Sequence, residues 1–402
     1  MTKIKNNLVE ILILISTLLL LFYSSDVIMY SDSARYLNGS SNNTPLYATL
    51  VLIIQSIFET YNSIVVFQTL FLGLGIIFFT NTLAIYFHLD ILKKLIVSIF
   101  LFLPVLKFYN NLLTEPICYA LSLFFVSFIV KLIFKFDIRN LIWSAIFVIL
   151  LLLSRTQFLF LYPLILLIYL GIFIINTSKK NFILLTICFM SIFVIQSSLI
   201  TLNKNFHKGN YQSKNLLDSQ RGIFHFIFID AMYISSSKDI ELFENKELKK
   251  TFTEIFTKMD DRNASIKNYD GRGHFGLSFG IIRDIANKEN FISIPDKKEI
   301  SIKIISMNFG KYVKLIFKKF YDSTWLFILV PFFMFLAASI EFYKHKSKVS
   351  LVIIFSSSFA LANHSVIYLF GRVQPRYLIY SDFILLIFIF MIFSIFLQKK
   401  DL

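Results

Sequence analysis

Cysteine, glycine and charged residues are all scarce in this chain of 402 residues. The only two cysteines, Cys118 and Cys188, both lie within long apolar runs, so the sequence has neither a disulfide framework nor the cysteine spacing of a metal site. Glycine occurs only 12 times, and no glycine-containing loop has the preceding strand and the Lys-Ser or Lys-Thr of a nucleotide-binding loop. Charged residues make up only 16% of the chain, which is too little for a soluble globular protein.

Apolar residues are correspondingly abundant, at 56% of the chain, and the mean hydropathy is +0.69. A transmembrane helix needs about 20 predominantly apolar residues. Ten runs approach this length: 8–23, 62–86, 91–108, 116–135, 140–154, 157–176, 181–200, 323–342, 349–369 and 378–397. The sequence therefore predicts an all-α polytopic membrane protein with about ten transmembrane helices.

The basic residues of the short loops indicate how these helices are oriented. Translocation disfavours Lys and Arg on the outer side, so Lys3 and Lys5 place the N-terminus inside. If each run crosses once, the later short-loop clusters share that side: Lys93 and Lys94; Lys131, Lys135 and Arg139; Lys179 and Lys180; Lys344, Lys346 and Lys348; Lys399 and Lys400. Both termini are then expected in the cytoplasm, and the expected location is a bacterial inner (plasma) membrane.

One further apolar segment, from Tyr47 to Phe58, does not fit this series of crossings. A crossing there would invert every later loop and place the basic clusters outside. We therefore predict an in-plane or re-entrant helix for this segment.

The pattern of runs predicts three parts. Residues 1–200 form an N-terminal bundle of about seven spans, 201–322 a small extracytoplasmic insert, and 323–402 a C-terminal bundle of three spans. Apolar residues recur at helical spacing from Lys238 to Met259 and from Ile300 to Phe320, so the insert is expected to be mainly helical. The second segment also carries several lysines, as expected of a helix in the headgroup plane.

The net charge of +15 bears on the partners of the chain. Most of the short-loop excess of Lys and Arg is predicted to face inside, where anionic membrane lipids attract it. We therefore expect membrane lipids and no nucleic acid as partners.

The ionisable residues predicted at the outer face are the functional candidates, because charge within a membrane bundle is costly and usually functional. The predicted outer loops contribute Asp26, Asp32 and Arg35, then Lys107 and Glu115, then Arg155, and finally Arg372 and Arg376. Three acids and several cations are thus expected on one side of the membrane.

Four sequence segments in this order resemble those of the GT-C glycosyltransferases: SDSARYL, LLTEPICYALSLFF, LLLSRTQFLFLYP and QPRYLIYSDFILL. The resemblance is to the family 39-like branch, which includes protein mannosyltransferases and lipid A aminoarabinose transferases. Members have an aspartate in the first outer loop, an acid before the fourth span, an arginine opening a middle span and a late Arg-Tyr pair. The matching residues are Asp32, Glu115, Arg155, and Arg376 with Tyr377. The resemblance does not extend to the insert, and the Asp-Glu pair of the eukaryotic mannosyltransferases is absent.

Sugar transfer from a polyprenyl phosphate needs a base for the acceptor, and a carboxylate in that role contributes about 10² to 10⁴ in rate. We expect Asp32 to be this catalytic base; the alternatives are a helix N-cap or a salt bridge to Arg35. Glu115, Arg35 and Tyr36 are expected to bind the substrate, although Glu115 can equally favour the N-terminus of its own helix.

The donor phosphate needs cations, and a guanidinium binds phosphate with a planar fork of donors. We expect Arg155, Arg372 and Arg376, together with Tyr377 and Lys107, to bind it. Arg155 can instead pair with Glu115 or Asp32, and Lys107 can extend to the membrane interface. The residues alone assign no metal; the resemblance implies that a divalent cation shared by Asp32 and Glu115 is an option.

These observations predict an inverting glycosyltransferase that uses a polyprenyl-phosphate sugar and a lipid, glycan or protein acceptor at the outer (periplasmic or lumenal) face. A polysaccharide polymerase or ligase is one alternative, with its essential Arg or His expected in the insert. A flippase or transporter of lipid-linked sugars is another, with charges expected at mid-membrane depth and paired repeats.

Overall fold

The computed structural model describes residues 7–23, 27–30, 33–37, 45–206, 223–268, 272–286, 292–322, 326–370 and 377–398. These residues are almost entirely helical, and among them there is no strand, only an isolated bridge between Ile28 and Asn111. The predicted all-α class is therefore confirmed. The chain divides into two compact units, called unit 1 (Met1–His207, Leu329–Asn363 and Arg376–Leu402) and unit 2 (Lys208–Ile328 and His364–Pro375).

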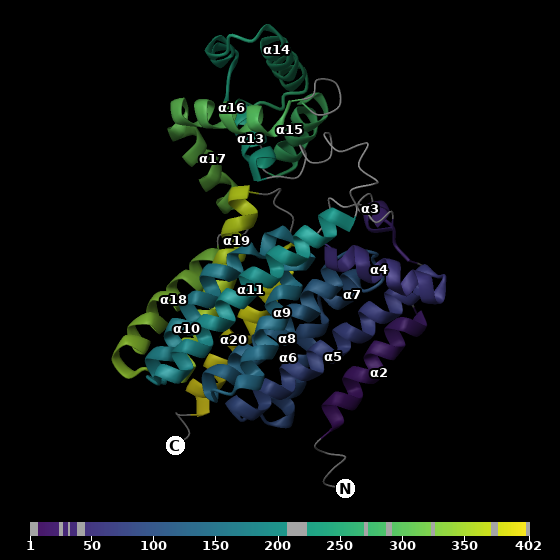
Figure 1. The fold of residues 1–402 in the computed structure, drawn as a ribbon, viewed down its shortest axis with the longest axis vertical. Helices are drawn as coiled ribbons and strands as arrows, with labels where there is room; N and C mark the ends of the chain where they lie inside the picture. Colours follow the sequence, from purple (N-terminus) through teal and green to yellow (C-terminus); the bar gives the residue numbers. More distant parts are fainter. Residues whose placement is uncertain are drawn as a thin grey trace. The chain divides into compact units, whose positions relative to one another are not determined.

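Unit 1 is a bundle of helices (Figure 1). Its N-terminal part contains α2 (Leu8–Tyr23), α3 (Ser33–Leu37), α4 (Pro45–Phe58), α5 (Tyr61–Phe87), α6 (Ile91–Phe102), α7 (Val105–Phe108), α8 (Glu115–Phe134), α9 (Ile138–Ser154), η1 (Thr156–Phe160), α10 (Leu161–Ile175) and α11 (Lys179–Phe206). Most of α18 (Leu326–His345) and α19 (Lys348–Phe370), and all of α20 (Ile379–Gln398), complete it. Each predicted apolar run coincides with one of these helices or with two in succession.

In the part of the chain that the structure describes, six helical segments are long and apolar enough to cross a membrane: Tyr61–Phe87, Glu115–Phe134, Thr156–Ile175, Lys179–Asn203, Ile328–His345 and Lys348–Leu369. The apolar segments of α2, α9 and α20 are shorter. The run 91–108 is not one continuous helix, because α6 ends at Phe102 and α7 begins at Val105. Pro104 stands between them and has no backbone N–H to continue the first helix.

Helix α8 lies at the centre of unit 1, because 83% of its apolar segment is buried, against 17% for α11 and 11% for α18. Close packing against α5 requires a glycine: a Cβ atom at Gly75 would lie 3.3 Å from backbone atoms of Ala120. Small residues commonly bring membrane helices this close together.

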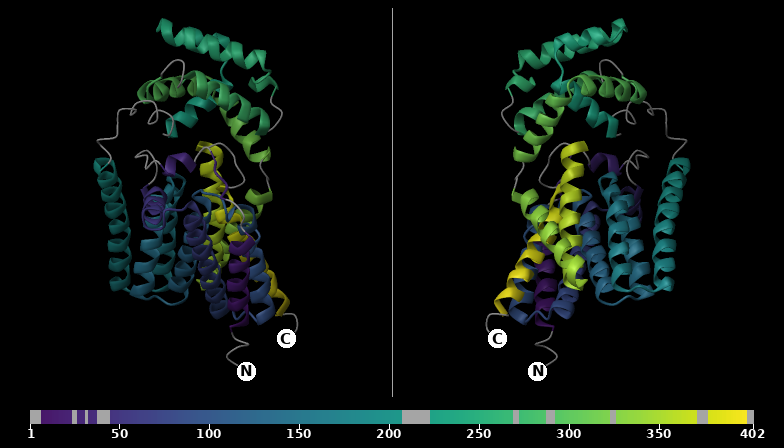
Figure 2. Two further views of the ribbon diagram at one scale, coloured as in Figure 1. Left: turned by 90° about the vertical axis from the view of Figure 1, so that its right-hand side faces the viewer. Right: turned by 90° about the vertical axis from the view of Figure 1, so that its left-hand side faces the viewer.

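Helix α4 runs across the long helices instead of alongside them, and it is seen end-on where they stand upright (Figure 2). It is separated from α5 by Glu59, which has a left-handed backbone with φ of 56°. Its buried side is formed by Tyr47, Ala48, Val51 and Ile54. This direction agrees with the predicted in-plane helix for Tyr47 to Phe58.

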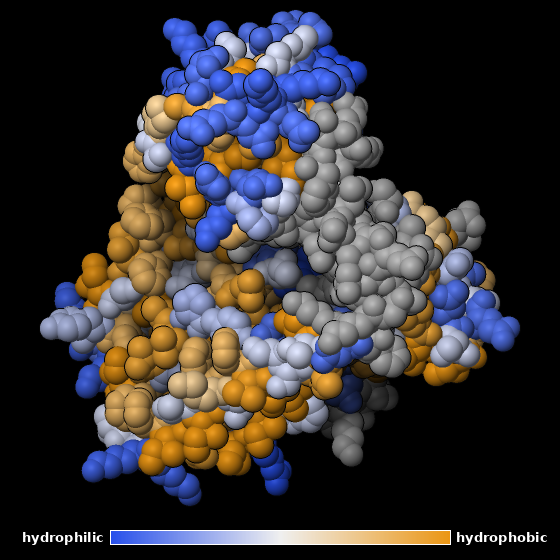
Figure 3. Space-filling model, turned by 45° about the horizontal axis from the view of Figure 1, so that its top comes forward, coloured by the Kyte–Doolittle hydropathy of each residue, from blue (hydrophilic) through white to orange (hydrophobic). Residues whose placement is uncertain are grey.

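Unit 2 is a separate helical unit with its own apolar core. It contains α13 (Ile223–Ile234), η3 (Ser237–Leu242), α14 (Lys246–Asp261), η4 (Ile266–Asn268), α15 (Arg272–Asp284), α16 (Ile294–Met307) and α17 (Phe309–Asp322). Its core includes Phe228, Met232, Ile255, Ile282 and Ile304. Polar side chains cover much of the visible surface of unit 2, whereas unit 1 presents many apolar ones (Figure 3).

Two helices of unit 2 differ from the sequence prediction. The segment from Lys238 to Met259 is interrupted because the Asn245 side chain accepts hydrogen bonds from Glu247 N and Leu248 N and so caps α14. The segment from Ile300 to Phe320 is also two helices, α16 and α17, on either side of Asn308.

The predicted lipid-facing side of the second segment is wrong as well. Ile304 belongs to the apolar core of unit 2, and Ile305 and Tyr312 pack against that core. A periodic apolar face indicates burial, and here the burial is within the protein.

Candidate functional site

A buried ion pair joins the start of α8 to the end of α9. Arg155 Nη1 lies 3.2 Å from Glu115 Oε1, and the two side chains are 20% and 3% exposed. Glu115 is in the first helical turn of α8 and is followed by Pro116, a position where the helix dipole favours a carboxylate. Arg155 directly follows α9 with an extended backbone, φ −156° and ψ 139°, so its side chain leaves the helix at the level of Glu115.

Further groups hold the Arg155 guanidinium in place. Nη1 also donates to Thr114 Oγ1 and to the hydroxyl of Tyr380, each at 3.2 Å. The ring of Tyr377 lies 4.2 Å from the guanidinium carbon, within the range of a cation–π contact. The start of α20 therefore completes a cluster with α8 and α9, which we call the Glu115–Arg155 cluster.

The guanidinium of Arg155 is only partly satisfied by this cluster. Every hydrogen bond that its side chain makes to the described residues starts from Nη1, whereas a guanidinium carries five N–H donors. Among the described residues, Nε and Nη2 therefore have no acceptor, and the side chain is 20% exposed. This edge of Arg155 is the part of the cluster that suits an anionic group.

The first loop of unit 1 is tied to the segment that leads into α8. Ile28 N donates to Asn110 O at 3.0 Å, and Leu112 N donates to Ile28 O at 3.1 Å. Ser33 Oγ donates to Leu112 O at 2.7 Å. Ser33 thus lies beside a residue only three positions before Glu115, although the two are distant in sequence.

The predicted base, Asp32, immediately precedes Ser33 but lies outside the described residues. Arg35 is in α3, where only its backbone is described. Tyr36 follows it, and its ring meets that of Tyr47 edge-on with centroids 4.8 Å apart. Tyr36 also interacts electrostatically with Arg155, which brings one predicted residue of the first loop close to the cluster.

A buried glutamine fixes the segment before α8. Gln68 Nε2 donates to Tyr109 O at 2.7 Å and to Asn111 O at 2.8 Å. Its Oε1 accepts from the Tyr47 hydroxyl at 3.3 Å. In the sequence, only the presence of a glutamine within an apolar run indicates that Gln68 has a structural role. That pattern does not identify the residues that Gln68 binds.

A second buried amide network fixes the start of α20. Gln157 Nε2 donates to Asn363 Oδ1 at 2.6 Å and to Tyr377 O at 2.9 Å. Asn363 Nδ2 donates to Tyr377 O at 3.1 Å and to Ser381 Oγ at 3.0 Å. These contacts position Tyr377 and Tyr380 against Arg155, and the sequence analysis did not identify Gln157, Asn363, Thr114 or Tyr380.

The structure therefore brings Glu115, Arg155 and Tyr377 together, with Tyr36 nearby. Lys107 is exposed on α7 and forms no hydrogen bond or ion pair with the described residues of the cluster. Arg372 and Arg376 lie outside the described residues, as does Asp32.

The described part of the chain contains no group of three or more His, Cys, Asp or Glu residues that could hold a metal ion. A cation shared by Asp32 and Glu115 involves a residue outside that part. Of these two carboxylates, Glu115 is paired with Arg155.

Comparison with other proteins adds no assignment: no protein-family model and no curated protein matches this chain.

Proposed function

We propose that this protein is an integral-membrane glycosyltransferase that transfers a sugar from a polyprenyl-phosphate donor to an acceptor at the outer face. The observation that carries the proposal is the Glu115–Arg155 cluster, in which Arg155 is held from several sides and keeps an open edge. An arginine presented in this way suits a phosphate with its planar fork of donors. The ten crossings and the cytoplasmic termini predicted above are part of this proposal.

Its chemistry requires one bond to form as another breaks. The acceptor oxygen or nitrogen attacks the anomeric carbon, and the bond from that carbon to the phosphate oxygen breaks, so the anomeric configuration inverts. The Asp32 carboxylate takes the proton of the acceptor. Arg155 stabilises the negative charge that grows on the departing polyprenyl phosphate, while Glu115 and Tyr380 keep the guanidinium in position.

The test is release of undecaprenyl phosphate from labelled undecaprenyl-phosphate sugars by the protein in proteoliposomes. A panel of glucose, mannose, galactose and aminoarabinose donors is needed, with total membrane lipid and glycan extracts as acceptors. We expect Arg155→Gln to lower the rate by about 10² to 10³, as for loss of another donor to developing charge. Failure of the wild type to release undecaprenyl phosphate from any donor contradicts the proposal.

The matched control is Arg139→Gln, near the other end of α9, where Arg139 N donates to Asp137 Oδ1 as part of a helix cap. This variant should retain the rate of sugar transfer, because Arg139 takes part in the cap through its backbone N–H, which the substitution keeps. Asp32→Asn tests the base separately. A transfer rate equal to that of the wild type would rule out Asp32 as the base and would leave the proposed role of Arg155 unaffected.

The location of the cluster distinguishes this proposal from the alternatives of the sequence analysis. A polymerase or ligase with essential Arg or His in the insert would depend on unit 2, whereas the Glu115–Arg155 cluster belongs entirely to unit 1. Glu115 and Arg155 also lie at helix ends, whereas transporters commonly place their charges at interrupted helices near mid-membrane depth.

A further inference from the structure

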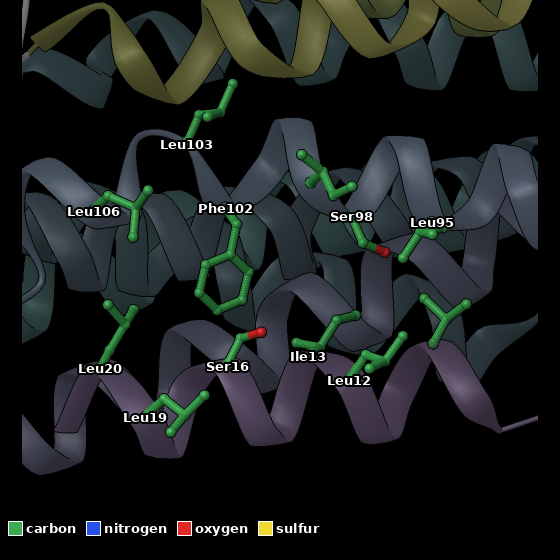
Figure 4. A pocket seen from close by; sticks show the side chains of 12 residues that line it. Leu12, Ile13, Ser16, Leu19, Leu20, Leu95, Ser98, Phe102, Leu103 and Leu106 are labelled. Atoms are coloured by element: carbon green, nitrogen blue, oxygen red, sulfur yellow. The ribbon is translucent and has the colours of Figure 1, made fainter. Parts of the chain in front are cut away.

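A long apolar groove runs between α2 and the α6–α7 segment of unit 1 (Figure 4). Its cavity volume is about 340 Å³. Ser16 and Leu20 of α2 point across the gap toward Phe102 and Leu106. The lining extends along α2 from Val9 to Leu20, which corresponds to about 16 Å of helix at a rise of about 1.5 Å per residue. The groove is thus elongated, as a chain-like ligand requires.

The lining offers almost nothing that a polar ligand can bind. Ser16 and Ser98 are its only polar residues, and the Ser98 hydroxyl donates to Lys94 O of its own helix at 2.8 Å. The remaining lining residues are Val, Leu, Ile and Phe. Hydrocarbon is the ligand chemistry that this surface fits.

Contacts on either side hold the groove open. Helix α2 approaches α5 closely at Gly73, where a Cβ atom would lie 2.6 Å from Thr17 Oγ1. At one end of the groove, Lys94 Nζ pairs with Glu10 Oε1 at 2.5 Å. These contacts tie α2 to α5 and to the start of α6.

The two ends of the groove differ in charge. The Glu10–Lys94 pair neutralises the end that the basic-loop pattern assigns to the inner side. At the other end, Leu103 and Leu106 line the groove, and the exposed Lys107 directly follows Leu106 in α7. Lys107 forms no ion pair with any residue that the structure describes. A ligand with a hydrocarbon chain and one anionic end matches this arrangement.

We propose that this groove binds the polyprenyl chain of the donor, with Lys107 holding the phosphate before it reaches Arg155. A groove between two parallel helices suits a single chain, whereas a diacyl phospholipid carries two. In the polypeptide, Lys107 is followed by the segment that Gln68 holds at Tyr109 and Asn111. That segment leads to Glu115. The inference rests on the proposed function for the identity of the donor, but binding can be measured without transfer.

The experiment measures binding of undecaprenyl phosphate to the purified protein in nanodiscs by native mass spectrometry. We expect Ser16→Trp, which fills the groove, to weaken binding at least tenfold. Leu18→Trp is the matched control, because Leu18 is on the same helix, is 57% exposed and does not line the groove. Lys107→Gln should weaken binding of undecaprenyl phosphate while leaving binding of undecaprenol unchanged.

A second measurement does not depend on how well Ser16→Trp folds. A benzophenone side chain at position 102 should crosslink to labelled undecaprenyl phosphate, and one at position 18 should not. Equal crosslinking at both positions, or displacement of the label by an equal amount of phosphatidylglycerol, overturns the proposal. The latter result assigns the groove to an ordinary membrane phospholipid.

The outcomes also separate this inference from the proposed function. Groove-dependent binding without any sugar transfer supports the groove and contradicts the glycosyltransferase. Sugar transfer that is unchanged in Ser16→Trp and Lys107→Gln supports the enzyme and contradicts the groove.

Discussion

The two helical units of this protein expose opposite kinds of surface. In unit 1, α11 leaves large apolar residues such as Ile187 (57%) and Met190 (58%) exposed. In unit 2, α14 buries Phe252 and Ile255 and exposes a charged side. An apolar exterior is stable against lipid and a polar exterior against water. The same helical secondary structure is therefore adapted to two different solvents.

Each unit also buries an ion pair, and the two pairs differ in how completely they are satisfied. In unit 2, Lys319 Nζ donates to both carboxylate oxygens of Asp230, at 2.6 and 2.7 Å, and each side chain is 3% exposed. In unit 1, Arg155 bonds to the described residues through Nη1 alone and is 20% exposed. A closed pair stabilises a fold, whereas a pair with an open edge can bind a ligand. This difference is why the second pair, and not the first, is the candidate site.

The largest effect should come from breaking the closed pair. Asp230→Ala leaves the Lys319 ammonium in the core without its carboxylate, which should destabilise unit 2 by about 3 to 5 kcal/mol. Burial raises the pKa of Asp230, against the effect of the Lys319 ammonium. Hydrogen exchange of peptides from α13 and α17, followed by mass spectrometry, should show the loss of protection.

The matched control replaces both charges by apolar residues, as Asp230→Leu with Lys319→Met. It should recover most of the protection, because a well-packed apolar pair often replaces a buried ion pair without loss. Peptides from α5 and α8 serve as an internal reference. Full protection of α13 in Asp230→Ala would show that the pair does not stabilise unit 2.

Glycine substitutions should have opposite signs in the two units. Gly75→Val in α5 forces side-chain carbon against the Ala120 backbone, which would lie 3.3 Å from the Cβ atom, and should destabilise unit 1 by about 1 to 3 kcal/mol. Gly280→Ala in α15 has no atom within 4 Å of the new Cβ. It should stabilise that helix by about 0.5 to 1 kcal/mol through helix propensity.

Thermal unfolding in detergent tests the first variant, and hydrogen exchange of α15 peptides tests the second. A higher unfolding temperature for Gly75→Val would contradict the close approach of α5 and α8. Faster exchange in Gly280→Ala would show that the open space beside Gly280 is filled in solution.

A buried histidine should give unit 2 a pH dependence of its own. His225 is 2% exposed, and its Nδ1 has no hydrogen-bond partner among the described atoms. Burial, together with the smaller effects of the Lys297 and Arg283 cations, lowers the pKa of His225 from 6.5 to about 3. The folded state therefore keeps this histidine neutral at pH values where the unfolded state is protonated.

Because the unfolded chain binds the proton first, stability should fall as the pH drops below about 6.5 and continue to fall toward pH 3. Between pH 7 and pH 5.5 the loss should be about 1 kcal/mol. Hydrogen exchange of α13 peptides across this range measures it. His225→Phe should remove the dependence, and an unchanged slope in that variant would assign the effect to another group.

The helices were largely predictable because apolar runs of membrane length leave few alternatives to helix. The breaks within the helices were harder to predict, because Pro104 and Asn308 interrupt segments whose apolar periodicity is continuous. The side of Ile304 and Tyr312 was also misassigned, because an apolar face does not show whether lipid or protein covers it. Glu115, Arg155 and Tyr377 were identified from type and position, but their pairing was only one of several options.

The sequence by itself determined that the chain is helical, that several helices can cross a membrane, and which few charged residues lie at helix ends. Those properties depend on local composition and on the cost of placing charge in lipid. Only the tertiary structure decided that Thr114 and Tyr380 hold Arg155, that Gln68 fixes the segment before α8, and that a groove remains beside α2. These features depend on contacts between segments that are distant in the sequence. Such contacts are set by the packing of particular side chains, which the local sequence pattern does not specify.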